Sequence, residues 1–176
     1  MVQRSFLLGP PLLIASREFP LKMLTALLAI VLSADSQTLT AKVVHIADGD
    51  TLTVLDSDNH EHKIRLAGID SPEKKQPFGS KAAEALSARV KGKDVRVEWK
   101  ARDKYGRIVG DVRLGDRRIN REMVECGMAW QYTRYDKSRD LREAEEGARK
   151  ERRGLWADER PVPPWEFRRK ERNAKR

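Results

Sequence analysis

The chain has 176 residues, which suffices for one domain with a core and is too short for two ordinary domains. Lys and Arg number 36 against 27 Asp and Glu, so the formal net charge is +9. This balance favours a polyanionic partner, because Lys and Arg release counterions from phosphates, although a basic protein that is merely soluble has the same charge. The single cysteine, Cys126, excludes an intramolecular disulfide and a cysteine-based metal cluster.

The first part of the chain has the features of a targeting segment. Basic residues precede the uncharged apolar run MLTALLAIVLS at residues 23–33. This run is short for a membrane span but has the length of the hydrophobic part of a signal peptide. We therefore expect residues 1–36 to be a signal peptide or an N-terminal membrane-targeting segment, and the protein to be secreted or periplasmic. The alternatives are a buried helix, an uncleaved anchor and a true start at Met23.

The next part of the chain predicts short strands. Runs rich in Val, Ile, Leu and Thr are separated by turn-like sequences, and they predict five strands: TAKVVHI, TLTVLDS, HKIRLAGI, DVRVEWKA and RIVGDVRL. The first three should form an antiparallel meander, because their connections are short.

Three helices are expected around these strands. The segment SKAAEALSARV, with Ser80 as a possible cap, follows the third strand. INREMVECG and the longer segment 138–154 follow the fifth strand. Five strands with about three helices predict an α+β, mainly β fold, namely a five-stranded OB-fold Greek-key barrel. We assign the domain to residues 40–158.

Residues 159–176 are expected to form a C-terminal tail. Its start, ERPVPPW, is rich in proline and should be extended, and its end, RRKERNAKR, is basic and should be mobile. Trp156 and Trp165 could hold the first part of this tail against the body.

Two acidic turns are the first candidates for chemistry. ADGDT contains Asp48 and Asp50, and DSPE contains Asp70 and Glu73. A hard cation such as Ca²⁺ takes carboxylate, carbonyl and water oxygens, which two neighbouring turns can supply. Each turn alone is more simply explained as a polar turn.

Two arginines strengthen this interpretation. Arg65 lies in the apolar run before DSPE, and Arg107 ends the motif DKYGR. The arginine fork matches phosphate oxygens, so two arginines beside a metal ion would stabilise the charge that develops on a phosphodiester under attack. Taken singly, Arg65 could be a paired strand residue and Arg107 a surface charge. His60 and His62 could also bind a metal, but a polar hairpin explains them better.

The chain resembles the staphylococcal nuclease-like, or thermonuclease, family in three motifs. These are DGDT at residues 48–51, IRLAGIDSPE at residues 64–73 and DKYGR at residues 103–107, and the ending GLWADERPVPPWEFRR is similar to that of bacterial members. The resemblance runs from about residue 40 to the C-terminus. Three spaced motifs together are far more specific than any one of them.

The resemblance implies roles for individual residues. Asp50 and Asp70 would bind Ca²⁺ through their carboxylates and Ser71 through its backbone carbonyl, with Asp48 supporting the metal turn. Arg65 and Arg107 would contact the scissile phosphate, and Glu73 would act as general base on water. The remaining candidates are substrate contacts: Lys104, Tyr105 and Tyr135.

The implied reaction is Ca²⁺-dependent hydrolysis of DNA and RNA, with the bond to the 5′ oxygen broken and 3′-phosphate ends left. We expect a monomer with nucleic acid as its substrate and no stable membrane partner after signal cleavage. One alternative is a non-catalytic OB-fold module that binds nucleic acid or protein. Such a module should lack some of the carboxylates and arginines named above, and this chain has all of them. Another alternative, an exported basic scaffold, leaves the three motifs unexplained.

Overall fold

The structure is a computed structural model, and it describes residues 36–175. The predicted signal segment, residues 1–36, therefore falls almost wholly outside the described residues. Among the described residues, no helix has the length and apolar character needed to cross a membrane.

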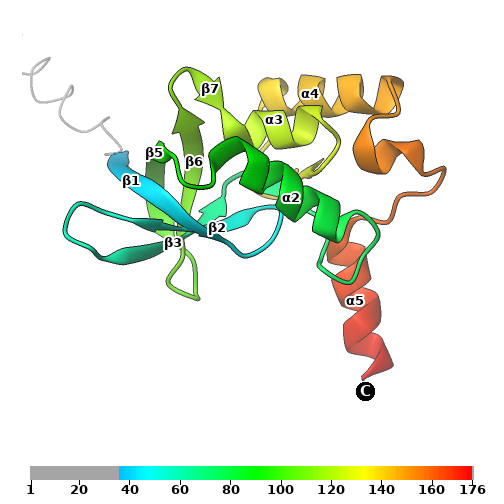
Figure 1. The fold of residues 1–176 in the computed structure, drawn as a ribbon. Helices are drawn as coiled ribbons and strands as arrows, with labels where there is room; N and C mark the ends of the chain where they lie inside the picture. Colours follow the sequence, from blue (N-terminus) through cyan, green and yellow to red (C-terminus); the bar gives the residue numbers. More distant parts are fainter. Residues whose placement is uncertain (1–35, 176) are drawn as a thin grey trace, which may run out of the picture. The chain divides into compact units, whose positions relative to one another are not determined.

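A closed β-barrel forms the centre of the described region (Figure 1). Its strands are β1 (Gln37–Ile46), β2 (Thr51–Leu55), β3 (Glu61–Leu66), β5 (Asp94–Arg102) and β6 (Ile108–Leu114). The sheet order is β3-β2-β1-β5-β6, and the barrel closes because β3 also pairs with β6 in parallel. The short strand β7 (Arg117–Arg118) pairs antiparallel with the end of β6. The predicted five-stranded OB-type barrel is confirmed.

The alternation of residues along the strands places the core inside the barrel. Alternate residues are buried through most of β6 and in the first half of β5, where Val95 and Val97 point inward, because successive side chains of a strand point to opposite faces. The largest wholly buried side chains include Leu52, Ile64 and Ile108, and Ile64 lies directly opposite Ile108 across the closing pair. Closure thus sets the register of Arg65, which is the next residue along β3.

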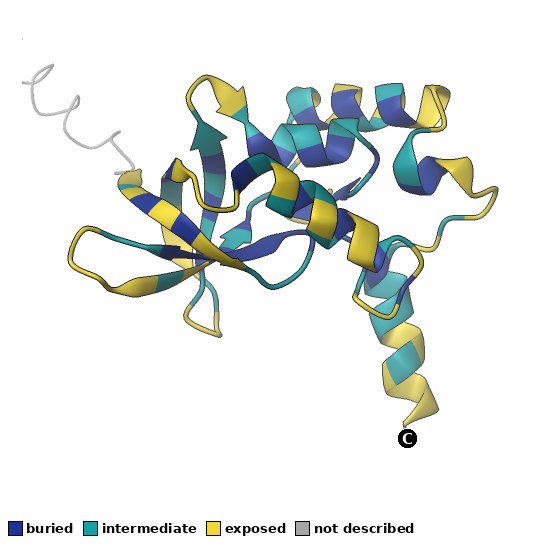
Figure 2. Cartoon of the chain, in the orientation of Figure 1, coloured by how far each residue is buried: buried dark blue, intermediate teal, exposed yellow. Residues whose placement is uncertain are grey.

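Helices cover one side of the barrel, as Figures 1 and 2 show. Helix α2 (Gly79–Val90) buries Ala82, Leu86 and Val90 against the strands. Helices α3 (Ile119–Glu125) and α4 (Arg139–Lys150) follow, and α4 buries Leu141, Ala144 and Ala148. The expected Ser80 cap is wrong: α2 starts at Gly79, after Phe78 in the left-handed conformation, and the N-cap residue makes no side-chain hydrogen bond.

The C-terminal segment forms a further helix, α5 (Pro164–Ala174), after the 3₁₀ turn η1 (Gly154–Ala157). The expectation of a mobile basic end is therefore wrong, and the described residues contain four α-helices instead of about three. Pro164 at the first helical position has the backbone angle that a helix needs, and Glu166 and Arg172 suit the charges of the two helix ends.

An aromatic cluster holds α5 in place. Trp165 packs edge-on against Trp130 at a ring distance of 5.7 Å and lies parallel to the ring of Tyr132 at 5.3 Å. Trp130 also meets Trp156, 4.3 Å away. The expected role of Trp156 and Trp165 in holding the segment is confirmed. Trp130 lies on the short strand β8 (Trp130–Gln131), which pairs with β4 (Ile69–Asp70), so the cluster connects α5 to one of the predicted acidic turns.

Candidate active site

The first acidic turn ends at the start of β2. Asp48 Oδ1 accepts the backbone N–H of Asp50 at 3.0 Å, which fixes the turn from within. The hydroxyl of Thr51 donates to Asp50 Oδ1 at 3.1 Å, and the backbone carbonyl of Asp50 accepts the N–H of Leu66 at 2.8 Å. These bonds hold the buried Asp50 carboxylate beside the end of β3.

The second acidic turn begins at β4 and is bonded to the first. The backbone N–H of Ser71 donates to Asp50 Oδ2 at 2.7 Å. Asp70 and Ser71 are buried, and the hydroxyl of Ser71 is a buried polar atom without a hydrogen-bond partner among the described residues. The two turns, which are some twenty residues apart in sequence, thus share one location.

Arg65 joins the two carboxylates. Its Nη2 lies 3.1 Å from Asp50 Oδ2 and 2.9 Å from Asp70 Oδ1, and its Nη1 donates to the carbonyl of Leu66 at 3.0 Å. One nitrogen in contact with both carboxylates shows that these carboxylates are neighbours. The structure therefore brings together the arginine and the two aspartates that the sequence separates.

Arg107 reaches the same place from the turn between β5 and β6. Its Nε donates to Asp103 Oδ2 at 2.8 Å, and Asp103 Oδ1 accepts the backbone N–H of Arg107 at 3.0 Å. Its Nη1 makes only a long 3.5 Å contact, to the hydroxyl of Thr51. Asp103 therefore orients Arg107 and leaves its terminal nitrogens available for another anion.

Glu73 has a partner that the sequence did not predict. Arg168 on α5 donates from Nη1 to Glu73 Oε1 at 2.6 Å and from Nη2 to Asp70 Oδ2 at 2.8 Å. Arg168 was missed because its segment was expected to be mobile. A signal was present, since Trp165, Arg168, Arg169 and Arg172 have the i, i+3, i+4, i+7 spacing of one helical face.

The predicted aromatic contacts lie at the entrance of the site. Tyr105 and Tyr135 are each 71% exposed, so their rings are accessible to nucleobases. The ammonium of Lys104 lies 5.0 Å from the ring centre of Tyr105. Tyr132, a neighbour of Tyr135 in the sequence, is stacked on Trp165 and supports α5.

All these residues line one hollow of about 910 Å³. Asp48, Asp50, Asp70 and Glu73 line it together with Arg65 and Arg107, and it extends to Lys104 and Tyr105 on the β5–β6 turn, to Tyr135 and to α5. It therefore contains every predicted site residue, Ser71 included. The grouping is geometric, and the individual roles remain predictions.

Burial and charge shape the protonation of the site. Burial raises the pKa of Asp50 to about 7, and the neighbouring Asp48 and Asp70 act in the same direction, against the opposing effect of Arg65. Partial burial would lower the pKa of Arg168, but its bonds to Asp70 and Glu73 outweigh this effect and raise it. Arg168 is therefore a fixed positive charge beside the carboxylates.

The donor atoms of the site suit a hard cation. Asp50 and Asp70 offer carboxylate oxygens at adjacent positions, and hard cations such as Ca²⁺ and Mg²⁺ prefer oxygen ligands. The unpartnered Ser71 hydroxyl adds a buried oxygen at the same turn. The residues present therefore fit a divalent metal ion, and their chemistry alone does not select which one.

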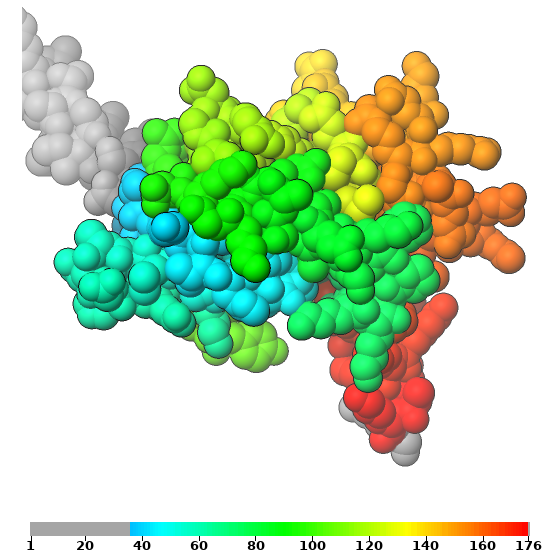
Figure 3. Space-filling model, in the orientation of Figure 1, coloured from blue at the N-terminus to red at the C-terminus, as the bar shows by residue number. Residues whose placement is uncertain are grey.

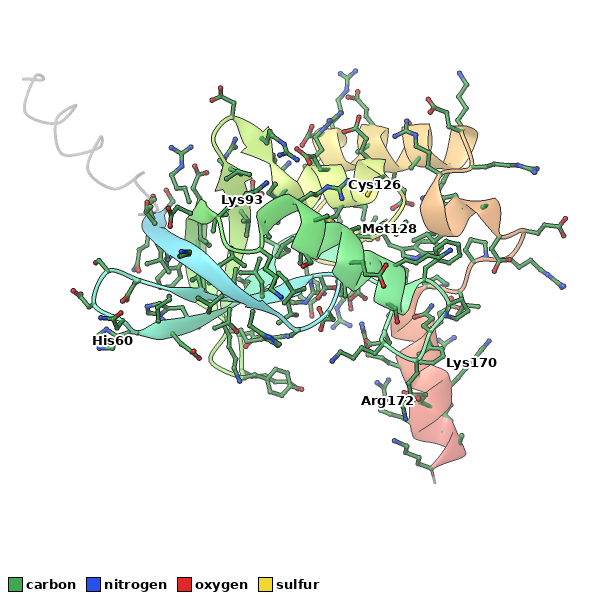
Figure 4. All side chains as sticks on the ribbon, in the orientation of Figure 1. His60, Lys93, Cys126, Met128, Lys170 and Arg172 are labelled. Carbon is green, nitrogen blue, oxygen red and sulfur yellow. The ribbon has the colours of Figure 1, made fainter. Side chains whose placement is uncertain are left out.

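A second acidic group lies elsewhere and has a structural explanation. Asp56, Asp58 and His60 gather in the turn between β2 and β3, where Figure 4 shows His60 at the hairpin tip. Asp56 Oδ1 accepts the backbone N–H groups of Asp58 and His60 at 2.9 Å, and His62 Nε2 lies 2.7 Å from Asp56 Oδ2. Since Asp56 is occupied in forming the turn, the expectation of polar hairpin residues agrees with this geometry.

Comparison with known proteins gives a consistent set of relatives. The sequence model of a family described as staphylococcal nuclease homologue matches residues 63–158. An uncharacterized endonuclease of Haemophilus influenzae is 46% identical over 153 residues, which span 85% of this chain and 86% of that protein. An uncharacterized endonuclease of Escherichia coli is 44% identical over 128 residues, 72% of this chain and 83% of that protein. The staphylococcal-like nuclease CAN1 of Arabidopsis thaliana is 44% identical over 110 residues, 62% of this chain and 34% of that protein.

Proposed function

Because this chain belongs to the family of staphylococcal nuclease homologues, and is thus a nuclease that hydrolyses phosphodiester bonds, we propose that it is an exported, Ca²⁺-dependent endonuclease acting on DNA and RNA. In this proposal water attacks the phosphorus, the bond to the 5′ oxygen breaks, and the phosphate stays on the 3′ end. The observation that carries the proposal is the contact of one Arg65 nitrogen with both Asp50 and Asp70 in the hollow that contains Glu73 and Arg107.

The metal ion would be held by the carboxylates of Asp50 and Asp70 and the backbone carbonyl of Ser71. When bound, the ion supplies Lewis-acid polarisation of a phosphoryl oxygen. Asp48 supports this arrangement through its bond to the N–H of Asp50. The all-oxygen donor set fits Ca²⁺, and the resemblance of the three motifs to the staphylococcal nuclease-like family supports Ca²⁺ over Mg²⁺ as the cofactor.

The two arginines would bind the scissile phosphate. Arg107, oriented by Asp103, has terminal nitrogens that can donate to phosphate oxygens. Arg65, whose terminal nitrogens contact both carboxylates and the carbonyl of Leu66, would exchange some of these contacts for phosphate oxygens. Both would stabilise the negative charge that grows on the phosphate during attack. Glu73 would take a proton from the attacking water, and the departing 5′ oxygen would gain a proton.

The substrate would lie across the exposed entrance of the hollow. Tyr105 and Tyr135 offer ring faces for stacking, and stacking accepts any base, which supports activity on both DNA and RNA. Lys104 adds a positive charge beside Tyr105. The protein would act as a monomer, without a stable membrane partner once its signal peptide is removed.

Export rests on the apolar run at residues 23–33 and the basic residues before it. Expression of the full chain in a bacterium, followed by fractionation and N-terminal sequencing, tests this part. A mature chain outside the cytoplasm that starts after residue 33 is the expected result. An intact N-terminus on a cytoplasmic protein would contradict export.

The activity is tested with purified protein on labelled DNA and RNA oligonucleotides, with added Ca²⁺ and with a chelator. We expect cleavage of both substrates only with Ca²⁺, and products with 3′-phosphate ends that a phosphatase can remove. Products with 5′-phosphate ends would contradict the proposed bond. Equal cleavage in the chelator would contradict the metal requirement.

A further inference from the structure

Helix α5 presents one basic face to the hollow. Trp165, Arg168, Arg169 and Arg172 all line it, and their spacing of three and four residues places them along one side of the helix. The acidic residues of α5, Glu166 and Glu171, do not line the hollow. The side of α5 nearest the carboxylates therefore carries positive charge only.

This basic face has a fixed position. Trp165 is stacked on the ring of Tyr132 and meets the ring of Trp130 edge-on, and the side chain of Gln76 donates to the carbonyl of Val162 just before the helix. Figure 3 shows α5 (red) against the segment between β4 and α2 (green). A prepositioned helix loses less conformational freedom on binding a ligand than a flexible tail would.

The outer arginines of this face have no internal partner. Arg168 is bonded to Asp70 and Glu73, but Arg169 and Arg172 are exposed, and no carboxylate within residues 36–175 forms an ion pair with either. Packing and ion pairs therefore explain Arg168 and leave Arg169 and Arg172 without a structural role. Guanidinium forks that face a groove are well suited to phosphate oxygens.

The β5–β6 turn forms the first basic wall of the hollow. The β5–β6 turn carries Lys104 and Tyr105, and Figure 1 shows this turn and α5 projecting from the same side of the barrel. Both line the hollow that holds Asp50 and Asp70. A nucleic-acid strand centred on the carboxylates would thus meet positive charge on both sides.

We propose that α5 is the second wall of the nucleic-acid groove, and that Arg169 and Arg172 bind backbone phosphates on one side of the scissile bond. Arg168 lies at the end of this row next to the carboxylates, and Arg172 lies one helical turn, about 6 Å, farther out. The proposal rests on the proposed function for its substrate class. It adds a binding surface outside the three family motifs.

Salt-dependent binding tests this proposal without requiring cleavage. A labelled single-stranded DNA is titrated with purified protein in a chelator, and fluorescence anisotropy gives the affinity at several KCl concentrations. Each lost phosphate contact lowers the slope of log affinity against log salt by about 0.7. We expect the double variant R169Q/R172Q to lose roughly 1.4 from the slope, and roughly 25-fold in affinity at 0.1 M salt.

Lys170 provides a matched control on the same helix. It lies two residues from Arg172, on the opposite side of α5, as Figure 4 shows, and it does not line the hollow. K170Q and R172Q remove the same charge from exposed positions. We expect R172Q to weaken binding and K170Q to match the wild type, with equal melting temperatures for all variants.

Equal binding by R172Q and K170Q would overturn the proposal. The nuclease assay separates this result from failure of the proposed function. If the wild type cuts DNA but R172Q and K170Q bind DNA equally well, the role of α5 is rejected and the nuclease assignment stands. If R172Q weakens DNA binding but the wild type cleaves DNA without Ca²⁺, the proposed cofactor is rejected and the role of α5 stands.

Discussion

Arg168 Nη2 lies 2.8 Å from Asp70 Oδ2, so an arginine of the C-terminal helix binds a carboxylate oxygen of the candidate metal site. The same guanidinium holds Glu73 Oε1 at 2.6 Å, and Arg65 holds the other oxygen of Asp70 at 2.9 Å. Both oxygens of the buried Asp70 are therefore engaged by arginines. A cation that uses Asp70 as a ligand must compete with them.

The first prediction follows from this competition. Arg168→Gln should raise Ca²⁺ affinity by roughly tenfold, since removal of a charged hydrogen-bond partner frees an oxygen of Asp70 and increases the negative charge around it. Isothermal titration calorimetry with CaCl₂ measures the change without any substrate. Arg169→Gln is the control, because it removes the same charge from the same helix without touching Asp70. Equal affinities for the two variants would show that Arg168 does not compete with the metal.

The second prediction concerns Glu73. Glu73→Gln should lower the cleavage rate in Ca²⁺ by a factor of roughly 10² to 10⁴, which is the usual contribution of a general base. The reason is that the amide cannot accept the proton of the attacking water. Calorimetry should show that Ca²⁺ still binds, since the metal ligands are unchanged. Glu61→Gln is the control, as Glu61 is an exposed glutamate at the start of β3. An unchanged rate for Glu73→Gln would remove Glu73 from the mechanism.

The barrel could be predicted because its sequence repeats a physical pattern. Alternating apolar residues bounded by turn residues identify strands, and strands of this number and order close in few ways. The meeting of Asp50, Arg65 and Asp70 could be anticipated as well, since Asp50 precedes β2, Arg65 lies near the end of β3, and Asp70 follows β3 by a few residues. The closing pair of β3 and β6 then brings Arg107 to the same end.

Helix α5 could not be predicted in the same way. Its segment begins with prolines and contains few apolar residues, so its pattern resembles an extended, basic tail. A short isolated helix is marginal in water, and α5 is held by tertiary contacts of Trp165 with Trp130 and Tyr132. These partners lie far away in sequence. The contact of Arg168 with Asp70 depends on the same packing.

The third prediction concerns Gly49, between the two aspartates of the first turn. A Cβ built at Gly49 would lie 2.5 Å from the Cβ of Ala82 and 2.8 Å from that of Ser71. Gly49→Ala should therefore cost roughly 1–3 kcal/mol of unfolding free energy, the usual penalty of overpacking. It should also weaken Ca²⁺ binding, because the clash separates Asp50 from Ser71. Urea denaturation and calorimetry measure the two effects.

Gly147 in α4 is the control for this substitution. Only the end of the Arg153 side chain, 3.7 Å away, would meet its added Cβ. Gly147→Ala should leave Ca²⁺ binding unchanged and stabilise the protein by up to about 1 kcal/mol, because alanine is the better helix former. If Gly49→Ala lowered neither the unfolding free energy nor the Ca²⁺ affinity, the turn would have to accommodate a Cβ atom for which the structure shows no space.

The last prediction is a pH dependence caused by Asp50. Burial raises its folded pKa to about 7 from an ordinary value of 3.8, so the folded protein binds this proton more tightly than the unfolded chain does. In a chelator, the contribution of Asp50 to stability is therefore full below about pH 4 and is lost as the pH rises to about 7. Asp50→Asn removes the ionisable carboxyl group and keeps a side chain of nearly the same shape. The melting temperature of this variant should rise relative to wild type between pH 4 and pH 7, and a constant difference over that range would contradict the raised pKa.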